Sequence, residues 1–166
     1  RYRPLGVVGV ISPWNAPVNL ALGPLISALY TGNTVVLKPS PYTPLATLKV
    51  GELLNEVFPR GVVNVLAGGD TLGAWITEHP GVDKISFTGS VATGLAIQRA
   101  AAETSVKHVS LELGGKNPLI VFPDADIAKA VDAAVAGMNF SWAGQSCGST
   151  SRLLVHESLY EKAVEL

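Results

Sequence analysis

A single cysteine, Cys147, lies in a loop of small residues and is the first candidate for a catalytic side chain. Ser146 precedes it and Gly148 and Ser149 follow it, so a substrate carbon could approach the sulfur with little steric hindrance. A thiolate is a strong nucleophile, and this pattern permits covalent catalysis. A lone free cysteine is also commonly a small buried apolar residue, and both interpretations stand at this point.

Glu112 is the second candidate, because a carboxylate can act as a general base. It lies between Leu111 and Leu113, which are both apolar. The competing interpretation is structural, since Lys116 is close enough in the sequence to form an ion pair with it. The residues alone leave both roles open.

Five short apolar runs alternate with helix-like segments and indicate an α/β fold. The expected strands are 5–12, 34–37, 62–66, 84–87 and 108–111. The expected helices are 18–30, a helix with Thr43 as its cap and Pro44 at its first position, 71–78 and 91–102. This alternation predicts a Rossmann-like parallel sheet with helices on both faces.

The pattern changes after Gly114 and Gly115. A strand over 117–122, a long helix over 124–140, a strand over 152–156 and a short amphipathic segment are expected there. These elements are too few to close a second domain. We therefore expect one domain over residues 1–114 and the incomplete start of a second α/β domain over residues 115–166.

Five unusual loops follow the expected strands, and ligands of open parallel sheets bind beyond the carboxyl ends of strands. Turn chemistry alone accounts for Gly, Pro, Asn and Ser in any one loop, but not for Trp14, Lys38 or Glu112. Ser90 opens a helix whose free N–H groups could face a phosphate. The loops are Pro13-Trp14-Asn15, Lys38-Pro39-Ser40, Ala67-Gly68-Gly69, Phe87-Thr88-Gly89-Ser90 and Glu112-Leu113-Gly114-Gly115.

Composition narrows the function classes. The net charge of −1 argues against nucleic acid and against an anionic membrane surface as partners. One cysteine cannot form an internal disulfide, which favours a cytoplasmic location. No apolar run is long enough to span a bilayer. The three histidines and the cysteine lack metal-ligand spacing, so no metal is expected.

Taken together, these motifs resemble those of the NAD(P)-dependent aldehyde dehydrogenase superfamily. The resemblance extends from Pro13-Trp14-Asn15 to Gly144-Gln145-Ser146-Cys147 and covers the whole chain. It implies the middle part of a longer enzyme, with most of a dinucleotide-binding domain over residues 1–114 and the N-terminal part of a catalytic domain over 115–166. It also implies a homo-oligomer, dimer or tetramer, in the full-length protein.

The resemblance implies a role for each candidate. Cys147 would attack the aldehyde carbonyl, and the Asn15 amide with the Cys147 main-chain N–H would stabilise the oxyanion. Glu112 would activate the water that hydrolyses the thioester. The cofactor, NAD or NADP, would be bound by Ser12, Trp14, Lys38, Ser40, Gly69, Gly89, Ser90 and Leu113. Pro41 stands where many NAD-preferring members have a glutamate, which leaves the choice of cofactor open.

The leading hypothesis is therefore oxidation of a small-molecule aldehyde to a carboxylic acid. A CoA-acylating relative is an alternative, although such relatives generally lack the basic glutamate. The second alternative is a catalytically inert nucleotide-binding fragment. We expect these 166 residues alone to be inactive, because they cannot enclose Cys147 from water.

Overall fold

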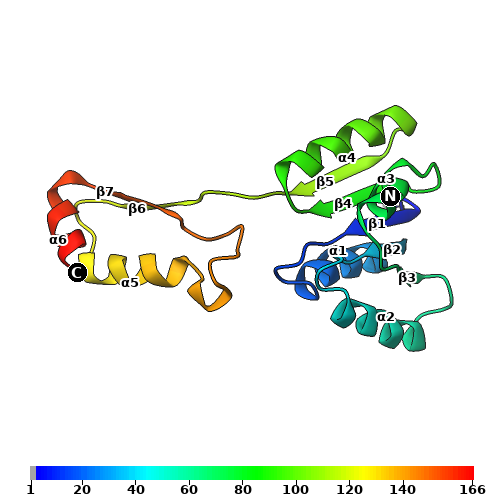
Figure 1. Ribbon diagram of the computed structural model, residues 1–166, viewed down its shortest axis with the longest axis horizontal. Helices are drawn as coiled ribbons and strands as arrows, with labels where there is room; N and C mark the ends of the chain where they lie inside the picture. The colour runs from blue at the N-terminus through cyan, green and yellow to red at the C-terminus, as the bar shows by residue number, and fades with distance from the viewer. Residues whose placement is uncertain (1–2) are drawn as a thin grey trace. The chain divides into compact units, whose positions relative to one another are not determined.

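The computed structural model describes residues 3–166, which form two compact units (Figure 1). The first unit ends at Leu113 and the second spans Gly114–Leu166. The division falls one residue before the boundary expected from the change in sequence pattern.

The first unit is built on a parallel sheet of five strands in the order β3-β2-β1-β4-β5. Each neighbouring pair of strands is parallel. This order is that of a Rossmann-type sheet without its sixth strand, so the predicted fold class is confirmed. The strands are β1 (Val7–Ile11), β2 (Thr34–Lys38), β3 (Val63–Val65), β4 (Lys84–Thr88) and β5 (His108–Glu112).

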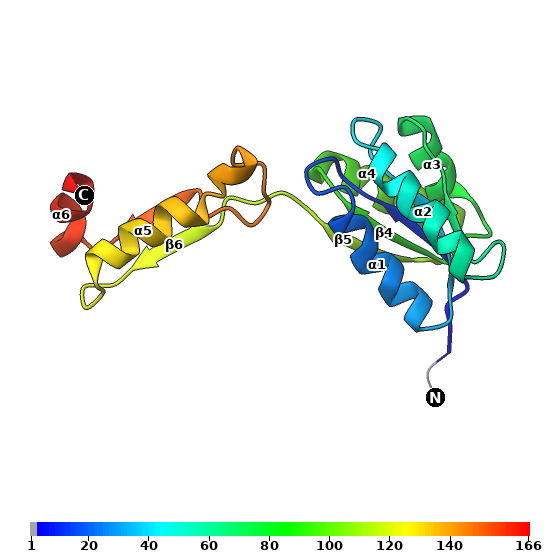
Figure 2. The same cartoon turned by 90° about the horizontal axis from the view of Figure 1, so that it is seen from below.

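Helices cover both faces of this sheet. Successive residues of a strand point to opposite faces, so each strand contributes side chains to both layers of helices. Val8 and Val10 belong to one hydrophobic core. Buried residues of α1 (Asn19–Tyr30) are part of this core, and α2 (Leu45–Val57) packs against it. Ile11 belongs to a second core formed with α3 (Asp70–Glu78) and α4 (Val91–Thr104). Figure 2 shows α1, α2, α3 and α4 around the strands. The neighbouring strands β1 and β2 are therefore buried on two sides, whereas β5 exposes alternate residues.

Two polar side chains fasten the start of β1. The Asn33 Oδ1 accepts hydrogen bonds from the main-chain N–H of Leu5 at 2.6 Å and of Gly6 at 2.9 Å. The Asp83 Oδ2 accepts one from the N–H of Val7 at 2.8 Å. Gly6 adopts a φ of 128°, a conformation that favours glycine. The central strand is thus anchored at its amino end to the residues preceding β2 and β4.

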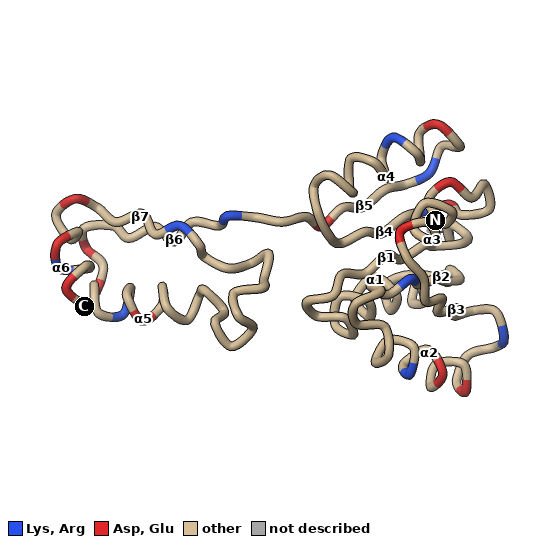
Figure 3. Tube along the Cα trace, in the orientation of Figure 1, with Lys and Arg blue, Asp and Glu red and all other residues tan. Residues whose placement is uncertain are grey.

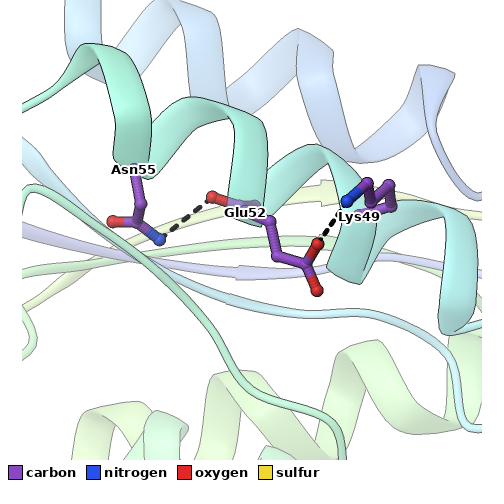
Figure 4. Close-up of polar contacts among 4 residues, drawn as sticks. Lys49, Glu52 and Asn55 are labelled. Carbon is purple, nitrogen blue, oxygen red and sulfur yellow. Dashed lines mark hydrogen bonds and ion pairs between the residues drawn. The ribbon is translucent and has the colours of Figure 1, made fainter.

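The start of α2 differs from the prediction. Pro44 is itself the N-cap, and its carbonyl accepts the first helical hydrogen bond from Leu48. The hydroxyl of Thr43 does not cap the helix but donates to the Trp14 carbonyl at 3.2 Å. On the same helix, Lys49 Nζ lies 2.7 Å from Glu52 Oε2, and Asn55 donates to the Gly51 carbonyl at 3.0 Å (Figure 4). Lys49, Glu52 and Asn55 are exposed, so these are surface contacts of α2.

The second unit is a β–α–β arrangement with two parallel strands. The helix between them is shorter than the predicted 124–140. It begins after Asp126, whose side chain accepts a hydrogen bond from the N–H of Lys129, and Asn139 follows it in the left-handed region at φ 55°. The elements are β6 (Pro118–Val121), α5 (Ile127–Gly137), η1 (Phe140–Trp142), β7 (Arg152–Val155), η2 (Glu157–Leu159) and α6 (Tyr160–Glu165).

Charges of both signs occur in each unit (Figure 3). Within residues 3–166, no helix has the length and apolar character needed to cross a membrane. The same residues contain no group of three or more His, Cys, Asp or Glu side chains that could hold a metal ion.

Candidate active site

The loops singled out in the sequence, as far as they belong to the first unit, lie at one edge of its sheet. All five strands are parallel, so their carboxyl ends share this edge. The strand order reverses between β1 and β4, which is where open α/β sheets form their ligand crevice. The loops after β1 and β4, beginning at Ser12 and Gly89, flank that point.

The loop after β1 is tied to the loop after β2. The main-chain N–H of Ser12 donates to the Lys38 carbonyl at 3.0 Å, and the Thr43 hydroxyl donates to the Trp14 carbonyl. Ser12 is 4% exposed, and its Oγ has no hydrogen-bond partner among the described residues. A buried hydroxyl of this kind normally has a partner, so Ser12 is suited to contact a ligand at this edge. Trp14 is 42% exposed and Asn15 is half-buried.

Lys38 is a buried cation at the end of β2. Its side chain is 4% exposed, and its ammonium donates to the Pro39 carbonyl at 3.4 Å. Burial lowers the pKa of Lys38 from its ordinary value, and the nearby Asp70 carboxylate partly offsets this effect. A lysine held out of water at the carboxyl end of a strand has donors to offer to hydroxyl groups.

Ser40 and Gly69 have different local roles. Ser40 is buried, and its Oγ accepts a hydrogen bond from the main-chain N–H of Tyr42 at 3.3 Å, which stabilises the turn. Gly69 precedes α3 at its N-cap position. A Cβ added at Gly69 would meet no atom within 4 Å, so space is open there.

The turn after β4 is fixed by Gly89 and Ser90. A Cβ added at Gly89 would overlap the ring of Phe87, so the close packing of this ring requires glycine. The Ser90 Oγ accepts from the N–H of Thr93 at 3.2 Å and caps α4. The cap is a structural role for Ser90, and it also orients the N-terminus of α4 at the sheet edge.

Glu112 and Leu113 end the first unit. The Glu112 carbonyl accepts a hydrogen bond from the N–H of Gly89 at 3.0 Å, which joins β5 to the turn after β4. Glu112 is exposed, and its side chain points to the opposite face of β5 from Leu111, which packs against the second core. Among the described residues, the Glu112 carboxylate is therefore not surrounded by buried apolar side chains. Leu113 packs against Gly94 of α4, where an added Cβ would come within 2.9 Å of it.

Cys147 lies in the second unit, in the loop between η1 and β7, and its side chain is exposed. The interpretation of a buried apolar cysteine is therefore wrong for the described chain. Asn117, which is not among the residues predicted from the sequence, donates from its Nδ2 to the Cys147 carbonyl at 2.6 Å and to the Ser149 carbonyl at 3.2 Å. No sequence signal marked this residue, because the cysteine loop is 30 residues away.

The protein comparisons agree with this fold and these motifs. The model of the aldehyde dehydrogenase family matches residues 1–166, and the chain belongs to that family. It is 50% identical over 162 residues to an aldehyde dehydrogenase of Talaromyces stipitatus, covering 98% of this chain and 31% of that protein. It is also 50% identical over 167 residues to retinal dehydrogenase 2 of Mus musculus, covering 99% and 32%.

Solved structures give the same assignment. An NAD⁺ complex of an aldehyde dehydrogenase from Bacillus cereus has a TM-score of 0.94 and 46% identity, covering 99% of this chain and 34% of that one. An NAD⁺ complex of betaine aldehyde dehydrogenase from Staphylococcus aureus has a TM-score of 0.92 and 46% identity, covering 98% and 32%. The chain thus spans about a third of the length of the relatives that it matches.

Proposed function

We propose that the full-length protein containing this chain oxidises an aldehyde to a carboxylic acid with NAD or NADP. The observation that carries the proposal is the family match over all 166 residues, which includes the three side chains needed for this chemistry. Cys147 is the nucleophile, Asn15 an oxyanion donor and Glu112 the base. Cys147 belongs to the second unit, and the other two belong to the first.

The residues divide the reaction between them. The Cys147 thiolate attacks the aldehyde carbon, and the oxygen that becomes an anion accepts hydrogen bonds from the Asn15 amide and the Cys147 main-chain N–H. The cofactor, when bound, supplies the hydride acceptor. Glu112 takes a proton from the water that attacks the resulting thioester, which releases the acid and restores the thiol.

The first unit fits a dinucleotide. The unpartnered buried hydroxyl of Ser12 and the buried ammonium of Lys38 lie at the carboxyl edge, and α4 begins at the same edge after Ser90. We propose that Lys38 binds ribose hydroxyls and that the start of α4 faces the pyrophosphate. The rest of the proposed cofactor site is lined by Trp14, Ser40, Gly69, Gly89 and Leu113. Pro41 provides no carboxylate against a 2′-phosphate, so NADP remains a candidate beside NAD.

Two further proposals concern the setting of the enzyme. A relative from Elephantulus edwardii is named a cytosolic aldehyde dehydrogenase, and we propose the cytoplasm for this protein as well. We also propose a homo-oligomer, dimer or tetramer, which light scattering of the full-length protein would test.

A single substitution tests the proposed function. In the full-length protein, Cys147→Ala should reduce aldehyde oxidation to less than about a tenth of the wild-type rate, because covalent catalysis is lost. Cofactor affinity should stay within about twofold. Lys49→Ala on the outer surface of α2 serves as a control that keeps full activity. Turnover that survives Cys147→Ala would refute the nucleophile assignment.

Two alternatives have distinct results in the same assays. A CoA-acylating enzyme would form an acyl-CoA and would not need Glu112 for hydrolysis. A catalytically inert nucleotide-binding protein would bind NAD or NADP without reducing either in the presence of any aldehyde. Product analysis with and without CoA separates these outcomes.

A further inference from the structure

We propose that Asn117 is a positioning residue that sets the main-chain conformation of the cysteine loop for the attack on the substrate. The proposal rests on the proposed function, in which Cys147 is the nucleophile. Asn117 immediately precedes β6, and its carbonyl accepts a hydrogen bond from the N–H of Arg152 at 3.2 Å. The pairing of β6 with β7 thus fixes the main chain of Asn117, independently of the contacts that its side chain makes with the loop.

The Asn117 amide contacts the loop at two points. Its Nδ2 donates to the carbonyl of Cys147 at 2.6 Å and to that of Ser149 at 3.2 Å. The amide carries two N–H donors on one nitrogen, and an aspartate at the same position would carry none. Asparagine is therefore the side chain of this length that can bind two carbonyl groups at once.

The peptide bond after Cys147 is held at both ends. Asn117 binds its carbonyl, and its N–H, on Gly148, donates to the Ser146 Oγ at 3.2 Å. The Cys147 side chain is exposed, so packing does not orient it within the described residues. Its direction then depends on the main chain that carries it, and hydrogen bonds fix that main chain.

The surroundings of Asn117 agree with a fixed geometry. A Cβ added at Gly115 would lie 3.1 Å from the Cys147 carbonyl oxygen and 3.2 Å from the Asn117 Oδ1, so the chain passes tightly beside this contact. On the other side of the loop, Ser149 is 5% exposed, and its Oγ donates to the Met138 carbonyl at 3.1 Å. The loop is therefore attached both to the start of β6 and to the end of α5.

Small displacements of a nucleophile lower the rate of attack strongly, since about 1 Å can cost roughly 100-fold. Asn117→Asp keeps nearly the same shape, but the carboxylate oxygen that replaces Nδ2 would face both the Cys147 and the Ser149 carbonyl oxygens and repel them. We expect kcat to fall by about 10-fold or more, with the aldehyde KM and the cofactor Kd within about twofold. The pre-steady-state burst of reduced cofactor should slow by the same factor as kcat.

Asn64→Asp is a matched control. The Asn64 Nδ2 also donates to two main-chain carbonyls, those of Val35 at 3.2 Å and Gly61 at 2.9 Å, but it lies in β3 of the first unit. This variant removes the same kind of contacts and should lose stability with kcat within about twofold of wild type. A similar fall of kcat in both variants would overturn the proposal, because it would reflect general destabilisation.

A second measurement separates this proposal from the proposed function. The rate at which iodoacetamide alkylates Cys147, followed by mass spectrometry of its peptide, should change in Asn117→Asp by at least about threefold and stay at the wild-type value in Asn64→Asp. If Cys147→Ala keeps its activity, the proposed function fails, and the alkylation rate still decides whether Asn117 positions the loop. An unchanged alkylation rate overturns the positioning role.

A milder variant covers the case in which Asn117→Asp does not fold. Asn117→Ser replaces the amide with a single hydroxyl donor, so its kcat should lie between those of Asn117→Asp and wild type. If the Asp variant does not fold, the kcat of Asn117→Ser should lie about 3- to 10-fold below wild type. Wild-type kcat and burst rate in a folded Asn117→Ser protein would overturn the proposal.

Discussion

Lys38→Met should weaken cofactor binding without lowering the stability of the fold. This combination distinguishes a ligand-binding lysine from a structural one, whose loss would lower stability. Methionine has nearly the same length and is apolar, so it can occupy the same buried space. The Lys38 side chain is only 4% exposed, and within residues 3–166 its ammonium makes one hydrogen bond, to the Pro39 carbonyl at 3.4 Å. The free protein therefore loses little when the charge is removed.

The magnitudes follow from this environment. Removal of a buried charge with one long hydrogen bond should leave the free energy of unfolding unchanged or raise it, because the desolvation penalty disappears. If the Lys38 ammonium binds ribose hydroxyls, its loss removes hydrogen bonds from a charged donor, worth about 1.5–3 kcal/mol. The cofactor Kd should then rise about 10- to 150-fold.

The effect on stability should depend on pH. Burial lowers the pKa of Lys38 in the folded protein, whereas the unfolded chain keeps the ordinary value near 10.5. Between the folded and unfolded pKa values, the unfolded state binds more protons, so wild-type stability rises with pH relative to the variant. The advantage of Lys38→Met should be largest below the lowered pKa of the folded protein and should shrink as the pH rises to 10.5.

Urea denaturation and calorimetric titration with NAD and NADP would measure both quantities in the full-length protein. Lys49→Met is the control, since that lysine is exposed and forms an ion pair with Glu52 on the surface of α2. It should change stability by less than about 0.5 kcal/mol and leave the cofactor Kd unchanged. A loss of more than about 1 kcal/mol of stability in Lys38→Met, or an unchanged Kd, would refute this reasoning.

Substitutions at three further residues test particular roles, one of them against a comparison variant. Glu112→Gln should keep a burst of reduced cofactor in stopped-flow measurements but lower the steady-state rate; an unchanged rate at neutral pH would make Glu112 structural. Gly89→Ala should lose about 1–3 kcal/mol in urea denaturation because its Cβ overlaps the Phe87 ring, whereas Gly69→Ala, with open space around it, should lose well under 1 kcal/mol; equal losses would contradict this packing. Asn33→Ala should lose about 2–3 kcal/mol, since its buried amide also donates to the Ala28 carbonyl at 3.1 Å, and a loss below about 1 kcal/mol would show that water replaces these contacts.

Much of the fold was predictable because its signals are local. Each strand of the parallel sheet is a short run with apolar positions, and the observed strands agree with the predictions to within two residues at either end. The gathering of the candidate loops at one edge followed from parallel topology alone. The roles of Ser12, Lys38, Glu112 and Cys147 in catalysis or binding stay predictions.

The errors arose where distant contacts or backbone conformation decide the structure. Thr43 has the sequence signature of a cap, but its hydroxyl binds the Trp14 carbonyl, 29 residues away. The apolar period of the helix after Asp126 continues to Met138 and Phe140, yet the left-handed conformation of Asn139 separates Phe140 from it. Asn117 was missed for the same reason as Thr43, because its partner lies 30 residues further along the chain.

The central position of β1 has a consequence for how the chain folds during synthesis. Its anchor at Asn33 lies 27 residues from Gly6, but its anchor at Asp83 lies 76 residues from Val7. One side of β1 therefore pairs early, while the other remains an open edge until β4 leaves the ribosome. Pulse-labelled hydrogen exchange should find the β1–β2 pairing protected before the β1–β4 pairing, and a nascent chain that ends before Asp83 should be a substrate for chaperones that bind exposed strand edges.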